Sequence, residues 1–425
     1  MTDALLDRRQ RLLGPNVPTF YRAPVHIVAG QGVWLTAADG RRYLDAYNNV
    51  PHVGHAHPRV TEAVARQAAT LDTHSRYLHD GILDYAERLV SRFAPPMAQV
   101  LFTCTGSEAM DVALRMAVSV TGRTGLIATD NTYHGNTTAV SQLSTRRPPV
   151  GGYPPNIRLV PPPGAESPAG GACGAPLEAF AAHVAEAVAD LEAAGHGVAA
   201  LVLCPVFANE GLPGVQPGWL EGAAAAVRAT GGLVIADEVQ PGLGRLGSDM
   251  WGHGFLGLAP DICVLGKSLG NGYPLAALVT SRAHMAAFRA RFGYFNTFAA
   301  TPVAAAAGNA VLDVMEAERL QQNAMEVGAA LLTELQNLDH SALVRVTGHG
   351  LMAAVEMRDG DDAPATALAE EVVEQMKDAG VLIGRIGRQM HILKIRPPLP
   401  FGRAHVMRTV ETLDRALRRA QTVAG

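Results

Sequence analysis

Short apolar runs that end in polar or small residues alternate along much of the chain with longer segments of helical periodicity. The clearest runs are Leu233–Ala236, which ends at Asp237, and Ile262–Leu265, which leads through one glycine to Lys267. Continuous apolar runs of four residues are typical of buried strands in a parallel sheet. Because such runs alternate with helical segments, the pattern predicts an α/β fold whose mostly parallel sheet is covered by helices on both faces.

The same pattern divides the chain into regions. Residues 1–55 contain a predicted hairpin with an Asp39-Gly40 turn, and we expect them to form the N-terminal part of a small domain. Residues 56–305 form the predicted large domain, and residues 306–425 form the C-terminal part of the small domain. Further helices are expected at 60–71, 82–93, 177–194, 306 to about 338, 365–379 and 403–420. Further strands are expected at 200–203, 343–346 and 348–357, with strand pieces near 381–386 and 391–395.

One long stretch interrupts this alternation. Pro148–Pro176 is rich in proline and glycine and has no apolar periodicity. Both features predict a surface loop, and a loop of this length can act as a lid over a binding site.

Composition and charge narrow the class of protein. The 425 residues, 48% of them hydrophobic, are enough for a large core and more than one domain. A formal net charge of -4 gives no support for a nucleic-acid partner. The N-terminus lacks an apolar segment of signal length, and no apolar run approaches the length of a membrane span. We therefore expect a cytoplasmic enzyme without a membrane partner.

Two groups of residues raise the question of a metal site. His52, His55 and His57 lie close together, but no carboxylate or second cluster follows at ligand spacing. We favour loop histidines that bond to the backbone, and we predict no metal site. The cysteines have neither metal nor disulfide spacing, and most lie in apolar surroundings, which favours reduced core residues. They are Cys104, Cys173, Cys204 and Cys263.

The two clearest strands each end in a residue that carries chemistry. In parallel sheets, ligands bind at the carboxyl ends of the strands. A desolvated lysine there can form a Schiff base, although Lys267 alone is equally compatible with a side chain that reaches solvent. Asp237 alone is compatible with a helix cap or a metal ligand. Together they suit pyridoxal phosphate, which needs a lysine for its aldehyde and an acid beside its ring nitrogen.

Two further motifs are compatible with this cofactor. Thr105 to Glu108 precede an alanine-rich amphipathic helix, and small residues at a helix N-terminus leave N–H groups free for a phosphate. Ser107 can instead be a simple helix cap. The sequence Tyr133-His134-Gly135 supplies an aromatic ring that is able to stack on a pyridine.

With these motifs in this order, the chain resembles the class III (subgroup II) pyridoxal-phosphate aminotransferases of fold type I. The resemblance runs from Gly54–Pro58 to Arg396–Leu399. It implies pyridoxal 5'-phosphate, a seven-stranded sheet in the large domain, an α+β small domain built from both termini, and a homodimer or dimer of dimers with shared active sites. The matching motifs are GSEAMDVALRMA, YHG, DEVQPGLGR, PDICVLGKSLGNGYPLAA, NTFAATPVAAAAGNAVL and GHGLMAAVE.

The resemblance also implies roles for individual residues. Lys267 would bind the cofactor and then move the substrate proton, and Asp237 would pair with the ring nitrogen. The other implied cofactor contacts are Gly106, Ser107 and, from the neighbouring subunit, Thr297 at the phosphate, and Tyr133, His134 and Gln240 around the ring.

Departures from the aminotransferase pattern point to the substrate. The usual arginine three residues before the C-terminal Pro-Pro pair is Lys394 here, and Arg396 directly precedes that pair. A usual Gly-Gly-Asn is replaced by a segment that ends in Thr301, and a usual glutamate is Cys204. Lysine is a poor partner for a carboxylate fork but a workable point charge for phosphate. A carboxylate bound by Arg396 or Arg245 is the alternative.

The runs NNVPHVGHAHP and SRYLHDGILDYAERL, together with LKIRPPL, resemble the ethanolamine-phosphate phospho-lyase branch of the family. We therefore expect elimination of phosphate from a small anionic amine such as phosphoethanolamine, giving acetaldehyde and ammonia. The alternatives are an ω-aminotransferase, an ammonia-lyase acting on an aminoethylphosphonate, and a catalytically silent cofactor-binding protein, which would need neither Lys267 nor Asp237. The candidate substrate-binding residues are Asn49, Tyr77, Thr301, Lys394 and Arg396.

Overall fold

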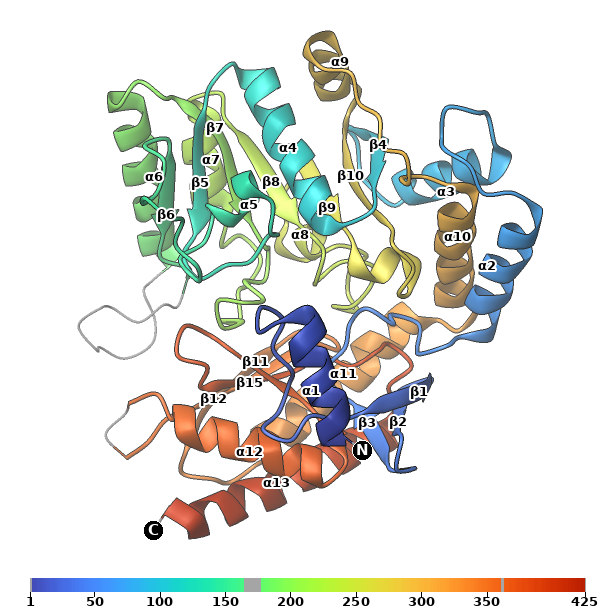
Figure 1. The fold of residues 1–425 in the computed structure, drawn as a ribbon. Helices are drawn as coiled ribbons and strands as arrows, with labels where there is room; N and C mark the ends of the chain where they lie inside the picture. Colours follow the sequence, from blue (N-terminus) through green and yellow to red (C-terminus); the bar gives the residue numbers. More distant parts are fainter. Residues whose placement is uncertain (1, 164–176, 361–362, 425) are drawn as a thin grey trace.

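The computed structural model describes residues 2–163, 177–360 and 363–424, and a seven-stranded sheet forms its centre (Figure 1). Strand β10 runs antiparallel to both of its neighbours, β9 and β4, and the other neighbouring strands are parallel. The expected α/β fold with a mostly parallel sheet is therefore confirmed. In order across the sheet, the strands are β4 (Met97–Thr103), β10 (Ala276–Ser281), β9 (Ile262–Leu265), β8 (Leu233–Asp237), β7 (Val198–Leu203), β5 (Gly125–Thr129) and β6 (Ile157–Val160).

Helices cover both faces of this sheet because its central strands are apolar on both sides. Ala200 and Val202 of β7 pack in the same core cluster as helix α4 (Gly106–Thr121). Leu201 and Leu203 pack on the opposite face with α6 (Leu177–Ala193) and α7 (Glu221–Ala229). Toward β4, that second face is covered by α3 (Asp80–Val90) and α10 (Pro302–Ala317). The remaining elements here are α2 (Pro58–Thr70), α5 (Thr138–Ser141), α8 (Gly252–Leu256), α9 (Arg282–Arg291) and the 3-10 helix η1 (Lys267–Gly270).

Both ends of the chain meet below the large sheet, where blue and red segments lie together in Figure 1. Strand β3 (Arg42–Asp45) pairs in parallel with β13 (Val381–Leu382), which joins the N-terminal hairpin to the C-terminal region. The two four-stranded sheets have the orders β1 (Ile27–Gln31), β2 (Trp34–Ala37), β3, β13, and β11 (Leu343–Gly348), β12 (Ala353–Met357), β15 (Ile392–Ile395), β14 (Gly384–Ile386). The helices of this region are α1 (Thr2–Leu13), α11 (Leu320–Gln336), α12 (Thr366–Asp378) and α13 (Arg403–Ala424).

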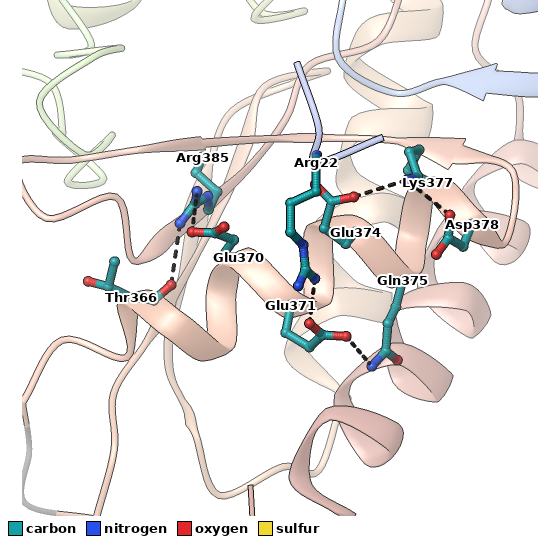
Figure 2. A network of polar contacts seen from close by, with 9 residues as sticks. All are labelled: Arg22, Thr366, Glu370, Glu371, Glu374, Gln375, Lys377, Asp378 and Arg385. Atoms are coloured by element: carbon teal, nitrogen blue, oxygen red, sulfur yellow. Dashed lines mark hydrogen bonds and ion pairs between the residues drawn. The ribbon is translucent and has the colours of Figure 1, made fainter. Parts of the chain in front are cut away.

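A network of polar contacts fixes the N-terminal segment to α12 (Figure 2). The backbone N–H of Arg22 donates to Oε1 of Glu374 at 2.7 Å, and its guanidinium pairs with Glu371 at 2.5 Å. Lys377 pairs with the other oxygen of Glu374 at 3.0 Å. Glutamates of α12 therefore hold a segment from the opposite end of the chain.

Two expectations from the periodicity were wrong in detail, and one was confirmed. The helix expected from 306 to about 338 is two helices, because Arg319 takes a left-handed conformation with φ of 48° between α10 and α11. The strand pieces expected near 381–386 are confirmed as two short strands, β13 and β14, which belong to different sheets. Pro148–Pro176, expected to be a loop, contains edge strand β6, and its residues 164–176 lie outside the described ranges. The expected boundaries at residues 55 and 305 stay predictions.

The three clustered histidines each bond to a different partner, and the described cysteines form no disulfide. His52 bonds to the carbonyl of Leu243, His55 to Asp45 and His57 to Glu318. Within the described ranges Cys104, Cys204 and Cys263 are free thiols, and Cys173 lies outside those ranges. A search of the described residues found no helix long and apolar enough to cross a membrane.

Candidate active site

Asp237 and Lys267 lie at the same edge of the large sheet because they follow neighbouring parallel strands, β8 and β9. A cavity of about 200 Å³ opens at this edge. Its lining contains every residue that the sequence assigned to the cofactor except Thr297. The lining residues are Gly106, Ser107, Tyr133, His134, Gly135, Cys204, Asn209, Asp237, Val239, Gln240 and Lys267.

Lys267 begins the short helix η1 in a strained backbone conformation. Its φ of 39° lies in the left-handed region, which a residue with a side chain rarely adopts unless the surroundings hold it there. Burial, together with the positive charge of Arg396, lowers the pKa of Lys267 to about 8. A much larger fraction of this amine is therefore neutral near pH 7 than for an ordinary lysine, which favours attack on an aldehyde.

Asp237 is held by two hydrogen bonds at the floor of the cavity. The backbone N–H of Val239 donates to Oδ1 at 3.0 Å, and Nδ1 of His134 lies 2.6 Å from Oδ2. The side chains of Asp237 and His134 are both buried. A carboxylate fixed in this way can face a protonated ring nitrogen without losing its orientation.

The N-terminus of α4 closes one end of the cavity. Thr105 and Glu108 form a capping box, in which the Thr105 hydroxyl accepts from the Glu108 N–H and the Glu108 carboxylate accepts from the Thr105 N–H. The N–H groups of Gly106 and Ser107 have no acceptor one turn earlier in the helix, so they are available to an anion. Gly135 lies against this turn, and a Cβ built on it would meet Cα of Ser107 at 2.8 Å.

Two basic side chains outside the cavity lining, Lys394 and Arg396, bond to Gln240, which itself lines the cavity. Nζ of Lys394 donates to the carbonyl of Ala208 at 2.6 Å and to Oε1 of Gln240 at 2.9 Å, and Nη1 of Arg396 donates to the same Oε1. Burial lowers the pKa of Lys394 well below its usual value, and it also lowers the pKa of Arg396. Among the ion pairs found between described residues, none includes Lys394 or Arg396.

Comparison with known proteins identifies the family. A family model described as Aminotransferase class-III matches residues 18–417. A phospholyase from Arthrobacter in complex with phosphoethanolamine has a TM-score of 0.93 and 41% identity, covering 97% of this chain and 99% of that chain. The chain belongs to the class III aminotransferase family. It is a pyridoxal-phosphate enzyme of fold type I.

Two relatives carry names that refer to different reactions of class III proteins. A Drosophila melanogaster protein named alanine–glyoxylate aminotransferase 2-like is 36% identical over 93% of this chain and 83% of its own length. A Caenorhabditis elegans protein named ethanolamine-phosphate phospho-lyase homolog 1 is 32% identical over 98% of this chain and 93% of its own length. Membership of the family therefore leaves both transfer and elimination open.

The residues of this class III site fit pyridoxal 5'-phosphate. The free N–H groups at the start of α4 suit its phosphate, Asp237 suits its ring nitrogen, and Lys267 suits its aldehyde. Tyr133 lines the cavity and is 48% exposed, which leaves its ring accessible to a ligand. Asn209 supports Tyr133 from behind, because its side-chain N–H donates to the Tyr133 carbonyl at 3.4 Å.

Several expected site residues lie outside the cavity. Asn49 is buried, whereas Tyr77 is 65% exposed and stacks on His74. Thr301 caps α10, with its hydroxyl accepting from Ala304 N–H at 3.3 Å, and Thr297 is exposed. Their assigned roles stay predictions.

Arg245 was an alternative partner for a substrate carboxylate. It is fully buried and donates to the carbonyls of Leu351 and Pro397 at 3.0 and 2.7 Å. These contacts indicate a structural role.

Sequence reasoning missed two residues of this site. Asn209 links Tyr133 to Gln240, whose Nε2 donates to Oδ1 of Asn209 at 3.1 Å. Thr132 places its hydroxyl 3.1 Å from Nε2 of His134. The signal for Asn209 was a polar pair, Asn209-Glu210, in an otherwise apolar segment. Thr132 had no signal beyond its place next to the YHG motif.

Proposed function

We propose that this class III enzyme is a phospho-lyase that removes phosphate from a small amino-phosphate such as O-phosphoethanolamine. One molecule of phosphoethanolamine and one of water would give acetaldehyde, ammonia and phosphate. The 41% identity and close superposition with the Arthrobacter phospholyase, whose structure contains phosphoethanolamine, support this proposal.

The proposal rests mainly on two basic side chains, Lys394 and Arg396, that bond to Gln240 next to the cavity. Lys394 and Arg396 are 2% and 6% exposed, and both donate to a neutral amide oxygen. The acceptors of Lys394 are the Ala208 carbonyl and Oε1 of Gln240, and among the ion pairs found between described residues none includes Lys394 or Arg396, so an anionic ligand would meet no carboxylate already paired with them. A phosphate in the cavity would compete with Oε1 of Gln240 for their N–H groups, and its charge would favour the ammonium form of Lys394.

The chain's own groups supply the remaining steps. Bound pyridoxal phosphate provides an electron sink for negative charge that develops at the carbon bearing the substrate amine. Nζ of Lys267 takes the proton from that carbon, and the carboxylate of Asp237 holds the ring nitrogen in its protonated state. The C–O bond on the adjacent carbon then breaks, and the leaving phosphate is stabilised by Lys394 and Arg396. Elimination prevails over amino transfer when a good leaving group occupies that adjacent carbon.

A second copy of the chain would complete the site. Thr297, expected at the cofactor phosphate, is exposed and does not line the cavity of its own chain. Large exposed side chains lie on the same and neighbouring loops: Leu78 is 97% exposed and Phe298 is 75% exposed. Burial of these side chains against another copy would favour a homodimer. Sedimentation of the purified protein tests this, and an active monomer would contradict it.

An ω-aminotransferase is the second candidate, and the Drosophila relative, which is named as an aminotransferase, supports amino transfer in general. Lys394, Arg396 or Thr301 would then meet a carboxylate in place of a phosphate. The cofactor residues are the same for both reactions, so they do not discriminate between them.

Product analysis separates the two functions. Purified holoenzyme is incubated with phosphoethanolamine and no keto acid, and phosphate, ammonia and acetaldehyde are measured over many turnovers. Equal amounts of the three products support the phospho-lyase. Absence of phosphate release, together with alanine formed from pyruvate and an ω-amine, would reject it in favour of the aminotransferase.

A further inference from the structure

A series of buried hydrogen bonds runs from Asp237 through His134 to Thr132; the first two residues line the cavity, and Thr132 is not part of its lining. Oδ2 of Asp237 lies 2.6 Å from Nδ1 of His134, and Nε2 of His134 lies 3.1 Å from the hydroxyl of Thr132. None of the three residues is more than 5% exposed. Because the three side chains are buried, their hydrogen-bond partners have a large influence on where the protons lie.

The chemistry of these groups decides which atom donates and which accepts in each of the two hydrogen bonds. A carboxylate can only accept, so Nδ1 of His134 must donate to Asp237. When the imidazole carries a single proton, Nε2 is then an acceptor, and it receives the hydroxyl hydrogen of Thr132. The hydroxyl therefore satisfies the nitrogen that would otherwise be a buried acceptor without a donor.

A neighbouring loop holds Thr132 in place. The hydroxyl of Ser144 donates to the carbonyl of Thr132 at 2.6 Å, and the guanidinium of Arg146 donates to the carbonyl of Asn131 at 3.0 Å. Asn131 itself has a left-handed φ of 58°. The two hydrogen bonds hold this strained turn in place, and with it the Thr132 hydroxyl that faces His134.

We propose that Thr132 is a positioning residue that acts through His134 on Asp237, and so sets how firmly the enzyme holds the proton on the cofactor's ring nitrogen. With the hydroxyl present, the imidazole needs no proton at Nε2, and Asp237 faces the cofactor with its full negative charge. Without the hydroxyl, Nε2 is either left without a donor or takes a proton, and a protonated ring would offset the charge of Asp237. This role applies whichever reaction the enzyme catalyses.

The test is the ¹⁵N NMR signal of the ring nitrogen in holoenzyme reconstituted with ¹⁵N-labelled pyridoxal phosphate. Thr132→Val keeps the shape of the side chain and removes its hydroxyl. We expect the signal to move toward the unprotonated form, kcat to fall about tenfold or more, and KM to change less than about twofold. Thr132→Ser restores the donor and should behave like the original protein.

The chain offers a matched control. Thr280 is also fully buried and also pairs with a histidine, since its hydroxyl lies 3.2 Å from Nδ1 of His284, but it lies on β10 away from Asp237. Thr280→Val should leave the ring-nitrogen signal and kcat unchanged. If Thr132→Val leaves both quantities as Thr280→Val does, the proposal is rejected.

A second variant keeps the test decisive if Thr132→Val fails to form holoenzyme. Thr132→Cys places a weaker donor at a similar volume, and the signal should then lie between those of Thr132→Ser and the unprotonated form. Equal signals for the serine and cysteine variants, with the original kcat, would overturn the proposal. Because the NMR signal needs no substrate, a failure of the phospho-lyase assay would not be confused with a failure of this inference.

Discussion

The buried amine of Lys394 donates a hydrogen bond of 2.9 Å to Oε1 of Gln240, a residue that lines the cofactor cavity. Because burial lowers the pKa of this lysine well below its usual value, an anion bound nearby would favour the ammonium form and be attracted by it in turn. This relationship links the C-terminal sheet, which carries Lys394 on β15, to the edge of the large sheet where Gln240 follows β8.

The first prediction concerns Lys394→Met, which keeps a long side chain and removes the amine. We expect kcat/KM for phosphoethanolamine to fall roughly tenfold to a hundredfold, mainly through a higher KM, because hydrogen bonds to charged groups contribute about 1.5–3 kcal/mol. Steady-state kinetics measure the change. The control is Lys377→Met, since Lys377 is also buried but pairs with Glu374 on α12. An equal loss in both variants would show that the effect is structural.

The second prediction concerns the pH dependence of cofactor capture. Because burial lowers the pKa of Lys267 to about 8, its amine is charged below that pH and neutral above it. The rate at which the apoprotein binds pyridoxal phosphate covalently should rise with pH and level off above about 8, as followed by absorbance. Lys267→Ala should show no such binding signal.

The cause of this lowered pKa is testable in the same assay. The positive charge of Arg396 contributes to it, after burial. Arg396→Met should therefore move the midpoint of the rate to higher pH. A midpoint that stays in place would show that burial alone lowers the pKa of Lys267.

The third prediction concerns acid stability and His52. Burial, with the nearby charge of Arg245, lowers the pKa of His52 from 6.5 to about 3. The unfolded chain therefore binds more protons between these values, and stability falls as pH drops below about 6.5, by up to about 1.4 kcal/mol per pH unit. In thermal melts, His52→Gln should lower the melting temperature at pH 7.5 and reduce its decline toward pH 5. His26→Gln, at a partly exposed site, should leave that decline unchanged.

The fourth prediction concerns Gly135 at the phosphate end of the cavity. A Cβ there would meet Cα of Ser107 at 2.8 Å, and the φ of 151° is one that residues with a side chain rarely adopt. Gly135→Ala should push Ser107 away from the anion and weaken cofactor binding by about tenfold or more, measured by titration of the apoprotein. Gly151→Ala also changes a glycine of positive φ, but a Cβ there has no neighbour within 4 Å, so cofactor affinity should be unchanged. Equal affinities in the two variants would contradict the expected clash.

Local pattern was enough to place Lys267 and Asp237 together. Each follows a continuous apolar strand, and the carboxyl ends of parallel neighbours must meet at one edge of the sheet. The motif at the start of α4 was also readable, because capping and free N–H groups are set by residues close in sequence. The α/β fold, the cofactor and the family were therefore determined by the sequence itself.

Contacts between distant residues were decided by the tertiary structure. Lys394 and Gln240 are 154 residues apart, and His134 and Asp237 are 103 apart, so no local period links either pair. The hydroxyl of Thr132 gained a function only when the fold buried it beside His134. Hydrogen-bond geometry depends on where separate elements pack, whereas strand ends and helix caps depend on neighbouring residues, and this difference separates what the sequence determined from what the fold decided.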